Sequence, residues 1–125
     1  MFAKQLKMKM KIKEKYRKVV NEFVKRALEK YGDKIDSIIL FGSVARGEAG
    51  KESDIDILVV AVGDRFKIRR ELSEIVLDIL LETGEYISVK TLSMENFKFL
   101  KEVKSSFLKN VMQEGVFIER DKVTA

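Results

Sequence analysis

The stretch LFGSVARGE at residues 40–48, followed by SDIDILVV at residues 53–60, decides the fold of this chain. It sets a Gly-Ser turn directly after one apolar strand and an Asp-x-Asp pair at the start of the next. Because side chains on a strand alternate between its two faces, we expect Asp54 and Asp56 to point to the same side. The backbone atoms of the two residues are then roughly 6–7 Å apart, so their carboxylates are near enough to converge on one hard cation or on a pair of them.

The Gly-Ser turn at Gly42 and Ser43 leads into a short helix. Such a turn offers free backbone N–H groups and a hydroxyl, which suit a phosphate, although the hydroxyl can equally cap the helix. Carboxylates for magnesium beside donors for phosphate are the groups needed to transfer a phosphoryl or nucleotidyl group. The structural alternative is a turn followed by two solvated aspartates that open a buried strand.

Gly-Ser, ten residues and then Asp-x-Asp within an apolar strand together resemble the signature of the DNA polymerase beta-like nucleotidyltransferase superfamily. The version GSVARG…SDIDILV is most similar to the minimal nucleotidyltransferases (MNT) of that superfamily. The core match spans residues 38–60, and the likeness in element order extends over residues 12–120. The resemblance implies an α/β (α+β) fold whose core is a mixed sheet of about four strands with helices packed on it.

The same resemblance implies roles for particular residues. Asp54 and Asp56 would be the catalytic metal ligands, holding Mg²⁺ or Mn²⁺ against the triphosphate of ATP. Gly42 and Ser43 would contact the β- and γ-phosphates. Ser43 is not expected to act as a nucleophile, because the chain has no imidazole to activate it.

Two further residues are candidates for nucleotide binding. Arg46 is expected to face the phosphates or an acidic partner, the alternative being a solvated arginine in the first turn of a helix. Ser53 directly precedes Asp54, so its hydroxyl is expected to support the metal site or to serve the turn.

A third carboxylate, which usually shares the metals in this superfamily, is the one departure. The matching position is Ser88, in the strand YISVK at residues 86–90. Glu85 is nearby, but strand alternation places it on the opposite face from Ser88 unless a bulge intervenes. Lys90 shares the face of Ser88 and is a candidate for a phosphate contact, or simply a surface lysine.

Minimal nucleotidyltransferases are similar to antitoxins that pair with a HEPN-domain ribonuclease and adenylylate a tyrosine on it. The resemblance therefore implies AMP transfer from ATP to a hydroxyl of such a toxin. The alternative is a degenerate module that binds nucleotide weakly, or none, and acts by masking its partner; the missing carboxylate favours it. Nucleic-acid binding through the basic N-terminus is a weaker third interpretation, because few aromatics are placed there for stacking.

Composition limits the chemistry. The 125 residues are 46% hydrophobic and 36% charged, which predicts one globular domain. With neither Cys nor His, thiolate zinc sites and imidazole catalysis are excluded, and any metal must be held by oxygen. No run approaches the ~18 apolar residues of a membrane span, so we expect no membrane contact and a cytoplasmic protein. The lack of Cys and the wealth of Lys and Glu also fit a thermophile.

The positive charge is concentrated at the N-terminus. Residues 1–31 hold eleven Lys or Arg and three Glu, whereas residues 32–125 hold fourteen basic and seventeen acidic residues. We therefore divide the chain into a basic arm at residues 1–11 and a single domain at residues 12–125. The charge either attracts an acidic partner or forms the solvated face of a helix.

Hydrophobic periodicity predicts the remaining elements. A first helix covers residues 12–31, and strands cover 35–41, 55–62, 86–92 and 116–118. Asp64 caps a helix that runs to Glu82, Ser93 caps the next, and a last helix starts near Ser105. The buried stripe of the helix after Asp64 is expected to be Phe66, Leu72, Ile75, Val76, Ile79 and Leu80. The helix between the second and third strands predicts a crossover connection.

Overall fold

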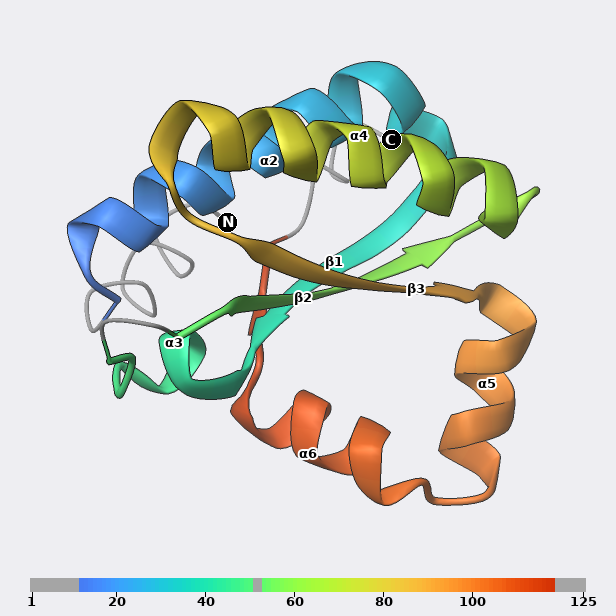
Figure 1. Cartoon of the computed structure of the whole chain (residues 1–125). Coiled ribbons are helices and arrows are strands. Elements are labelled where there is room, and N and C mark those ends of the chain that lie inside the picture. The colour runs from blue at the N-terminus through green and yellow to red at the C-terminus, as the bar shows by residue number, and fades with distance from the viewer. Residues whose placement is uncertain (1–11, 51–52, 119–125) are drawn as a thin grey trace.

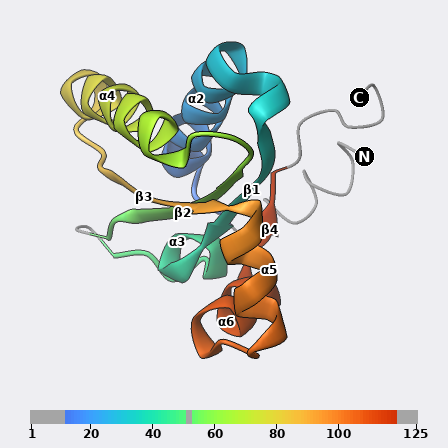
Figure 2. The same ribbon diagram turned by 90° about the vertical axis from the view of Figure 1, so that its right-hand side faces the viewer.

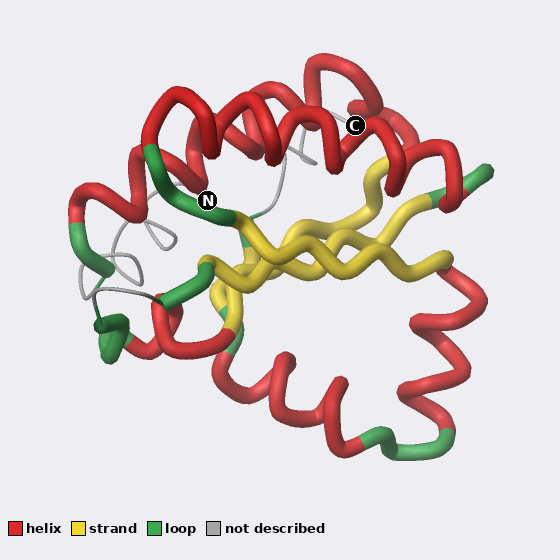
Figure 3. Tube along the Cα trace, in the orientation of Figure 1, coloured by secondary structure: helices red, strands yellow, loops and turns green. Residues whose placement is uncertain are grey.

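A computed structural model describes residues 12–50 and 53–118; the predicted basic arm at 1–11 lies outside the described residues. Four strands form one sheet in the order β3-β2-β1-β4 (Figures 1 and 3). The strands are β1 (Ile35–Phe41), β2 (Ile55–Ala61), β3 (Ile87–Ser93) and β4 (Val116–Phe117). β1 pairs antiparallel with β2 and β4, whereas β2 and β3 are parallel, so the predicted mixed sheet is confirmed.

Helices cover both faces of this sheet, as Figures 1 and 2 show. The helices of the first face are α2 (Glu14–Tyr31) and α4 (Arg65–Thr83), and those of the second face are α5 (Met94–Glu102) and α6 (Ser106–Glu114). The short α3 (Gly42–Arg46) joins β1 to the loop before β2, and a 3-10 turn (Gly32–Lys34) joins α2 to β1. As predicted, α4 is the crossover between the parallel strands β2 and β3.

The larger core lies between the sheet and the pair α2 and α4. Phe23 and Ala27 of α2 and Leu72 and Ile79 of α4 are fully buried there. The smaller core lies under α5 and α6, where Leu108 and Val111 pack on the sheet. Because β2 is covered on both faces, it is apolar at almost every position rather than at every second one.

Two sequence predictions about the first face are wrong. Helix α2 begins at Glu14, because Lys13 is extended (ψ 144°), although the Ile12 side chain is buried as expected. Phe66 is 63% exposed, and Ile68 takes the inward position. Asp64 caps α4 as predicted, accepting hydrogen bonds from the N–H groups of Phe66 and Lys67, which fixes the start of the helix. Side chains two positions apart on a helix point in directions that differ by about 200°. Phe66 must therefore point away from the sheet, because Ile68 points toward it.

The caps and boundaries of the other elements agree closely with the sequence. Ser93 accepts from the N–H of Asn96 at 3.0 Å, so the predicted cap at Ser93 is confirmed, and Ser105 caps α6 by accepting from the N–H of Leu108 at 3.4 Å. β3 begins one residue later than predicted, and β2 ends one residue earlier. In the part of the chain that the structure describes, no helix combines the length and the apolar character needed to cross a membrane.

Candidate active site

The register of the sheet places three side chains in one row on the face of α5 and α6. Asp56 of β2 is flanked by Phe41 of β1 and by Ser88 of β3. Its neighbours in sequence, Ile55 and Ile57, are buried in the core of the opposite face. Directly paired residues point to the same side of a sheet, so Phe41, Asp56 and Ser88 line one surface at the end where α3 follows β1.

Gly42 lies against the carboxylate of Asp56. Its φ of +78° is in the left-handed region, and a Cβ placed on it would overlap Oδ2 of Asp56 and lie 3.2 Å from Cγ. Only glycine allows both this backbone conformation and this approach. The missing Cβ thus leaves room for the carboxylate of Asp56, and the contact of Gly42 with a phosphate stays a prediction.

Ser43 lies inside α3, because the helix begins at Gly42. The N-cap position belongs to Phe41, so the alternative in which the Ser43 hydroxyl caps the helix is wrong. The hydroxyl is half-buried and directly follows the glycine that contacts Asp56.

The polar side chains around this surface share one property. Within residues 12–50 and 53–118, none of them makes a hydrogen bond or an ion pair with another residue. They are Ser43, Asp54, Asp56, Ser88 and Lys90. These groups are exposed or half-buried, so in the free chain they are open to solvent and available to a ligand.

Burial raises the pKa of Asp56, and the nearby charge of Asp54 raises it further, while Lys90 and Arg46 act in the opposite direction. The two carboxylates therefore repel each other, and the positive charges near them compensate only in part. A divalent cation between them relieves that repulsion. Because the donors are carboxylate oxygens, the site fits Mg²⁺ or Mn²⁺.

Arg46 is bound by two carboxylates at the rim of the site. Its guanidinium contacts Glu48 at 2.9 Å and Glu114 of α6 at 3.0 Å, and these hydrogen bonds raise its pKa. The arginine expected at the phosphates thus connects α3 to α6 in the free chain.

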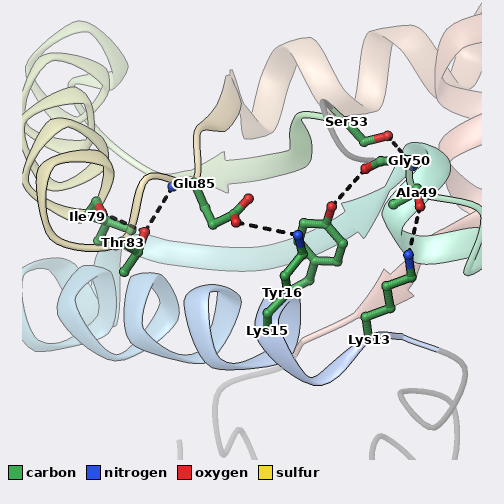
Figure 4. Close-up of polar contacts among 9 residues, drawn as sticks. All are labelled: Lys13, Lys15, Tyr16, Ala49, Gly50, Ser53, Ile79, Thr83 and Glu85. Carbon is green, nitrogen blue, oxygen red and sulfur yellow. Dashed lines mark hydrogen bonds and ion pairs between the residues drawn. The ribbon is translucent and has the colours of Figure 1, made fainter.

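Ser53 serves the turn before β2. Its Oγ accepts a hydrogen bond from the N–H of Gly50 at 2.8 Å. Figure 4 shows that this loop also lies against α2, where the Tyr16 hydroxyl donates to the carbonyl of Gly50 and Lys13 Nζ to that of Ala49. The loop that leads into the Asp-x-Asp pair is therefore positioned by the N-terminal end of α2.

Glu85 does not join the carboxylate pair. It extends toward α2, where its carboxylate lies 3.8 Å from Lys15 Nζ (Figure 4). Strand alternation had predicted this opposite face. Among the described residues no group of three Asp, Glu, His or Cys is arranged to hold a metal ion, so the described part of the site has two carboxylates.

Phe41 and Phe107 form an aromatic wall that sequence reasoning missed. Their rings meet edge to face, with centroids 5.8 Å apart, next to the row that contains Asp56. The sequence held a signal for Phe41. It is the last residue of its strand, directly before Gly42, so it lies opposite Asp56, and paired residues share a face of the sheet. Phe107 comes from α6, and no local pattern links it to the strand.

Comparison with known proteins shows the family through a family model and a relative, and shows the fold through a solved structure. The model of the nucleotidyltransferase domain matches residues 20–118. A protein of Methanocaldococcus jannaschii named "Putative protein adenylyltransferase MJ0604" is 40% identical over 98 residues, covering 78% of this chain and 92% of the relative. The crystal structure of "a putative nucleotidyltransferase from Sulfolobus solfataricus" has the same fold, with a TM-score of 0.50, 22% identity and coverage of 86% of this chain and 85% of the other. The crystal structure of a toxin–antitoxin with AMP-PNP scores 0.47 at 22% identity over 82% of this chain and 74% of the other.

Proposed function

The chain belongs to the nucleotidyltransferase domain family, and from that premise we propose that it transfers AMP from ATP to a hydroxyl group of a protein in a magnesium-dependent reaction. One observation carries the proposal: Asp56 lies against Gly42 next to Asp54, and neither carboxylate has a partner in the described chain. Two unpaired acids that repel each other cost the free protein stability, and groups with perturbed pKa values of this kind are typical of functional sites.

In this proposal Asp54 and Asp56 hold the divalent cation. The bound cation would neutralise charge on the triphosphate and on the departing pyrophosphate. The Gly42–Ser43 turn brings backbone N–H groups and the Ser43 hydroxyl toward the phosphates beside Asp56. Ser53 and the contacts of the preceding loop with α2 help to fix the position of Asp54, which directly precedes β2. The acceptor hydroxyl gives its proton to solvent, and its oxygen bonds to the α-phosphorus as the bond from that phosphorus to the pyrophosphate oxygen breaks.

We propose a HEPN-type ribonuclease toxin as the acceptor, with a tyrosine as its modified residue, so that the chain acts as an antitoxin. The resemblance to minimal nucleotidyltransferases supports this partner, and the name of the M. jannaschii relative supports a protein acceptor. The surface supports it too, because α5 and α6 expose apolar side chains on the same side of the sheet as Asp56. Those side chains are Phe99, Val103, Phe107 and Met112. A group of exposed apolar side chains beside a site is typical of a protein-binding surface.

The test is the intact mass of a HEPN protein encoded beside this chain, recorded after incubation with the chain and Mg-ATP. We expect the partner to gain the mass of one AMP. Asp54→Asn should lower the rate by about a thousandfold or more, because the cation supplies several kcal/mol of stabilisation in the transition state. Asp78→Asn, an exposed aspartate on α4 away from the site, is the matched control and should leave the rate unchanged.

The second candidate function is a partner-masking module without catalysis. Ser88 favours it, because the residue paired with Asp56 in β3 offers no carboxylate. In that case the partner gains no mass, and the complex forms equally tightly with Asp54→Asn. A thermal melt separates the two candidates further: a working site gains stability from ATP only when magnesium is present, whereas a masking module gains none.

A further inference from the structure

Lys90 occupies a defined place beside the carboxylates. It lies two residues beyond Ser88 on β3 and pairs with Leu58, which lies two residues beyond Asp56 on β2. Lys90 and Asp56 are therefore diagonal neighbours on one face of the sheet, with backbones about 7–8 Å apart. The flexible four-carbon stem of a lysine can cross that separation and bring its ammonium group above Ser88.

The number of carboxylates limits the number of cations. A pair of aspartates carries two negative charges, which one divalent cation balances. Without a further anionic ligand from the protein, a second divalent cation beside the first would have to share these two aspartates and rely otherwise on phosphate oxygens and water. Ser88 stands where β3 could have supplied that ligand, and the described residues contain no third acid at the site.

Lys90 and Arg46 are the described basic residues whose charges act on Asp56, and of this pair Lys90 is the one available to a phosphate. Arg46 is already held by Glu48 and Glu114. Lys90 is exposed, and in the described part of the chain it makes no ion pair. A lysine ammonium binds phosphate oxygens as a point charge.

We propose that this site binds one divalent cation, between Asp54 and Asp56, and that the ammonium of Lys90 takes the place of a second cation on the triphosphate. Ser88 and Lys90 would act together. Because Ser88 is not an acid, the second cation is not held, and the positive charge of Lys90, two residues further along the strand, takes the place of that cation. This inference rests on the proposed function, since it concerns the same nucleotide site.

The first test counts cations. Binding of Mn²⁺ to the full chain is followed by electron paramagnetic resonance in the presence of saturating α,β-methylene-ATP, whose α-phosphorus cannot be transferred. We expect one Mn²⁺ per wild-type chain and two in Ser88→Asp. Two Mn²⁺ in the wild type, or one in a folded Ser88→Asp chain, would overturn the inference.

The second test measures the affinity for the same analogue at saturating Mg²⁺. Lys90→Met should weaken binding about tenfold, and Lys90→Arg, which keeps the charge, should stay near the wild type. Lys67→Met, at an exposed lysine of α4, is the matched control and should change nothing. In the Ser88→Asp background the effect of Lys90→Met should shrink, because a second cation then supplies the charge. Equal affinities of Lys90→Met and Lys67→Met would contradict the proposed role, and circular dichroism establishes that each variant is folded.

The proposed function and the single-cation inference can be refuted separately. A wild-type chain that transfers AMP with two cations bound refutes the single-cation inference and leaves the proposed function intact. A wild-type chain that takes up no Mn²⁺ with the analogue refutes the proposed function and this inference with it.

Discussion

On the face of the sheet that α2 and α4 cover, β2 presents Ile55, Ile57 and Val59, all of them buried, along its whole length. On the face that α5 and α6 cover, the same strand presents buried Leu58 and Val60 and then Asp56. One strand thus changes from apolar to charged on one side only. The change occurs where β1 ends and α3 begins.

The difference shows how a small chain can hold two carboxylates without internal partners. Packing on the α2 and α4 side fixes the strand, so the other side can carry groups that cost stability. The smaller cluster under α5 and α6 closes only part of that face, and the uncovered part contains the row of Phe41, Asp56 and Ser88. Stability and chemistry are therefore assigned to opposite faces of the sheet.

The largest expected effect tests whether the face that α2 and α4 cover contributes more to stability than the opposite face. Phe23→Ala removes a fully buried ring between α2 and the sheet and should lower the free energy of unfolding by about 3–5 kcal/mol. Phe97→Ala makes the same change on α5, where the ring is half-buried, and should cost about 1–2 kcal/mol. Urea denaturation followed by circular dichroism measures both. Equal losses would show that the two faces contribute alike.

The next effect joins stability to the site. Gly42→Ala should cost about 1–3 kcal/mol of folding free energy, because alanine is strained at a φ of +78°. It should also abolish the magnesium-dependent stabilisation by ATP, because the new Cβ displaces the carboxylate of Asp56. A thermal melt with and without Mg-ATP records both results.

Gly84→Ala is the matched control for that substitution. Gly84 ends α4 with a φ of +80°, and a Cβ there would meet no atom within 4 Å. It should therefore show the backbone strain and keep the response to ATP. If Gly42→Ala also kept that response, the contact between Gly42 and Asp56 would not matter to the site.

The sequence was sufficient for the fold where the signals are local. The Gly-Ser turn, the Asp-x-Asp pair and the helix cap at Asp64 each depend on residues within a few positions of one another. The β2–α4–β3 crossover follows from element order, and the parallel pairing of β2 and β3 then places Ser88 beside Asp56. That pairing could be anticipated because both strands begin at recognisable boundaries.

The errors have a different physical origin. Phe66 was assigned to the core because its position fitted an apolar stripe, but the cap at Asp64 sets the helix phase that buries Ile68 instead. The expectation that Arg46 faces the phosphates or an acidic partner stays a prediction, but the sequence did not indicate that Glu114, 68 residues later in the chain, contacts it. No local pattern encodes such a contact. It depends on how α6 packs beside α3.

The smallest expected effect is specific to Asp56, on the face of β2 that α5 and α6 partly cover. Burial and Asp54 raise the pKa of Asp56 in the folded chain, so folding favours its protonated form. That contribution to stability is complete below the pKa of an unfolded aspartate and is lost as the pH rises through the raised folded value. At pH 7 without metal, Asp56→Asn should therefore raise the melting temperature by about a degree or two, a small gain because solvent screens the half-exposed group.

The sign of this effect should depend on pH and on magnesium. Near pH 3, where Asp56 is largely protonated in both states, the difference between Asp56→Asn and the wild type should vanish. With Mg-ATP at pH 7 the order should reverse, because only the wild type gains stability by binding. Asp78→Asn, on the exposed side of α4, should show neither change. A metal-free Asp56→Asn chain that melts below the wild type at pH 7 would mean that the carboxylate stabilises the fold. The assignment of stability to one face of the sheet and of chemistry to the other would then be wrong for Asp56, its most important residue.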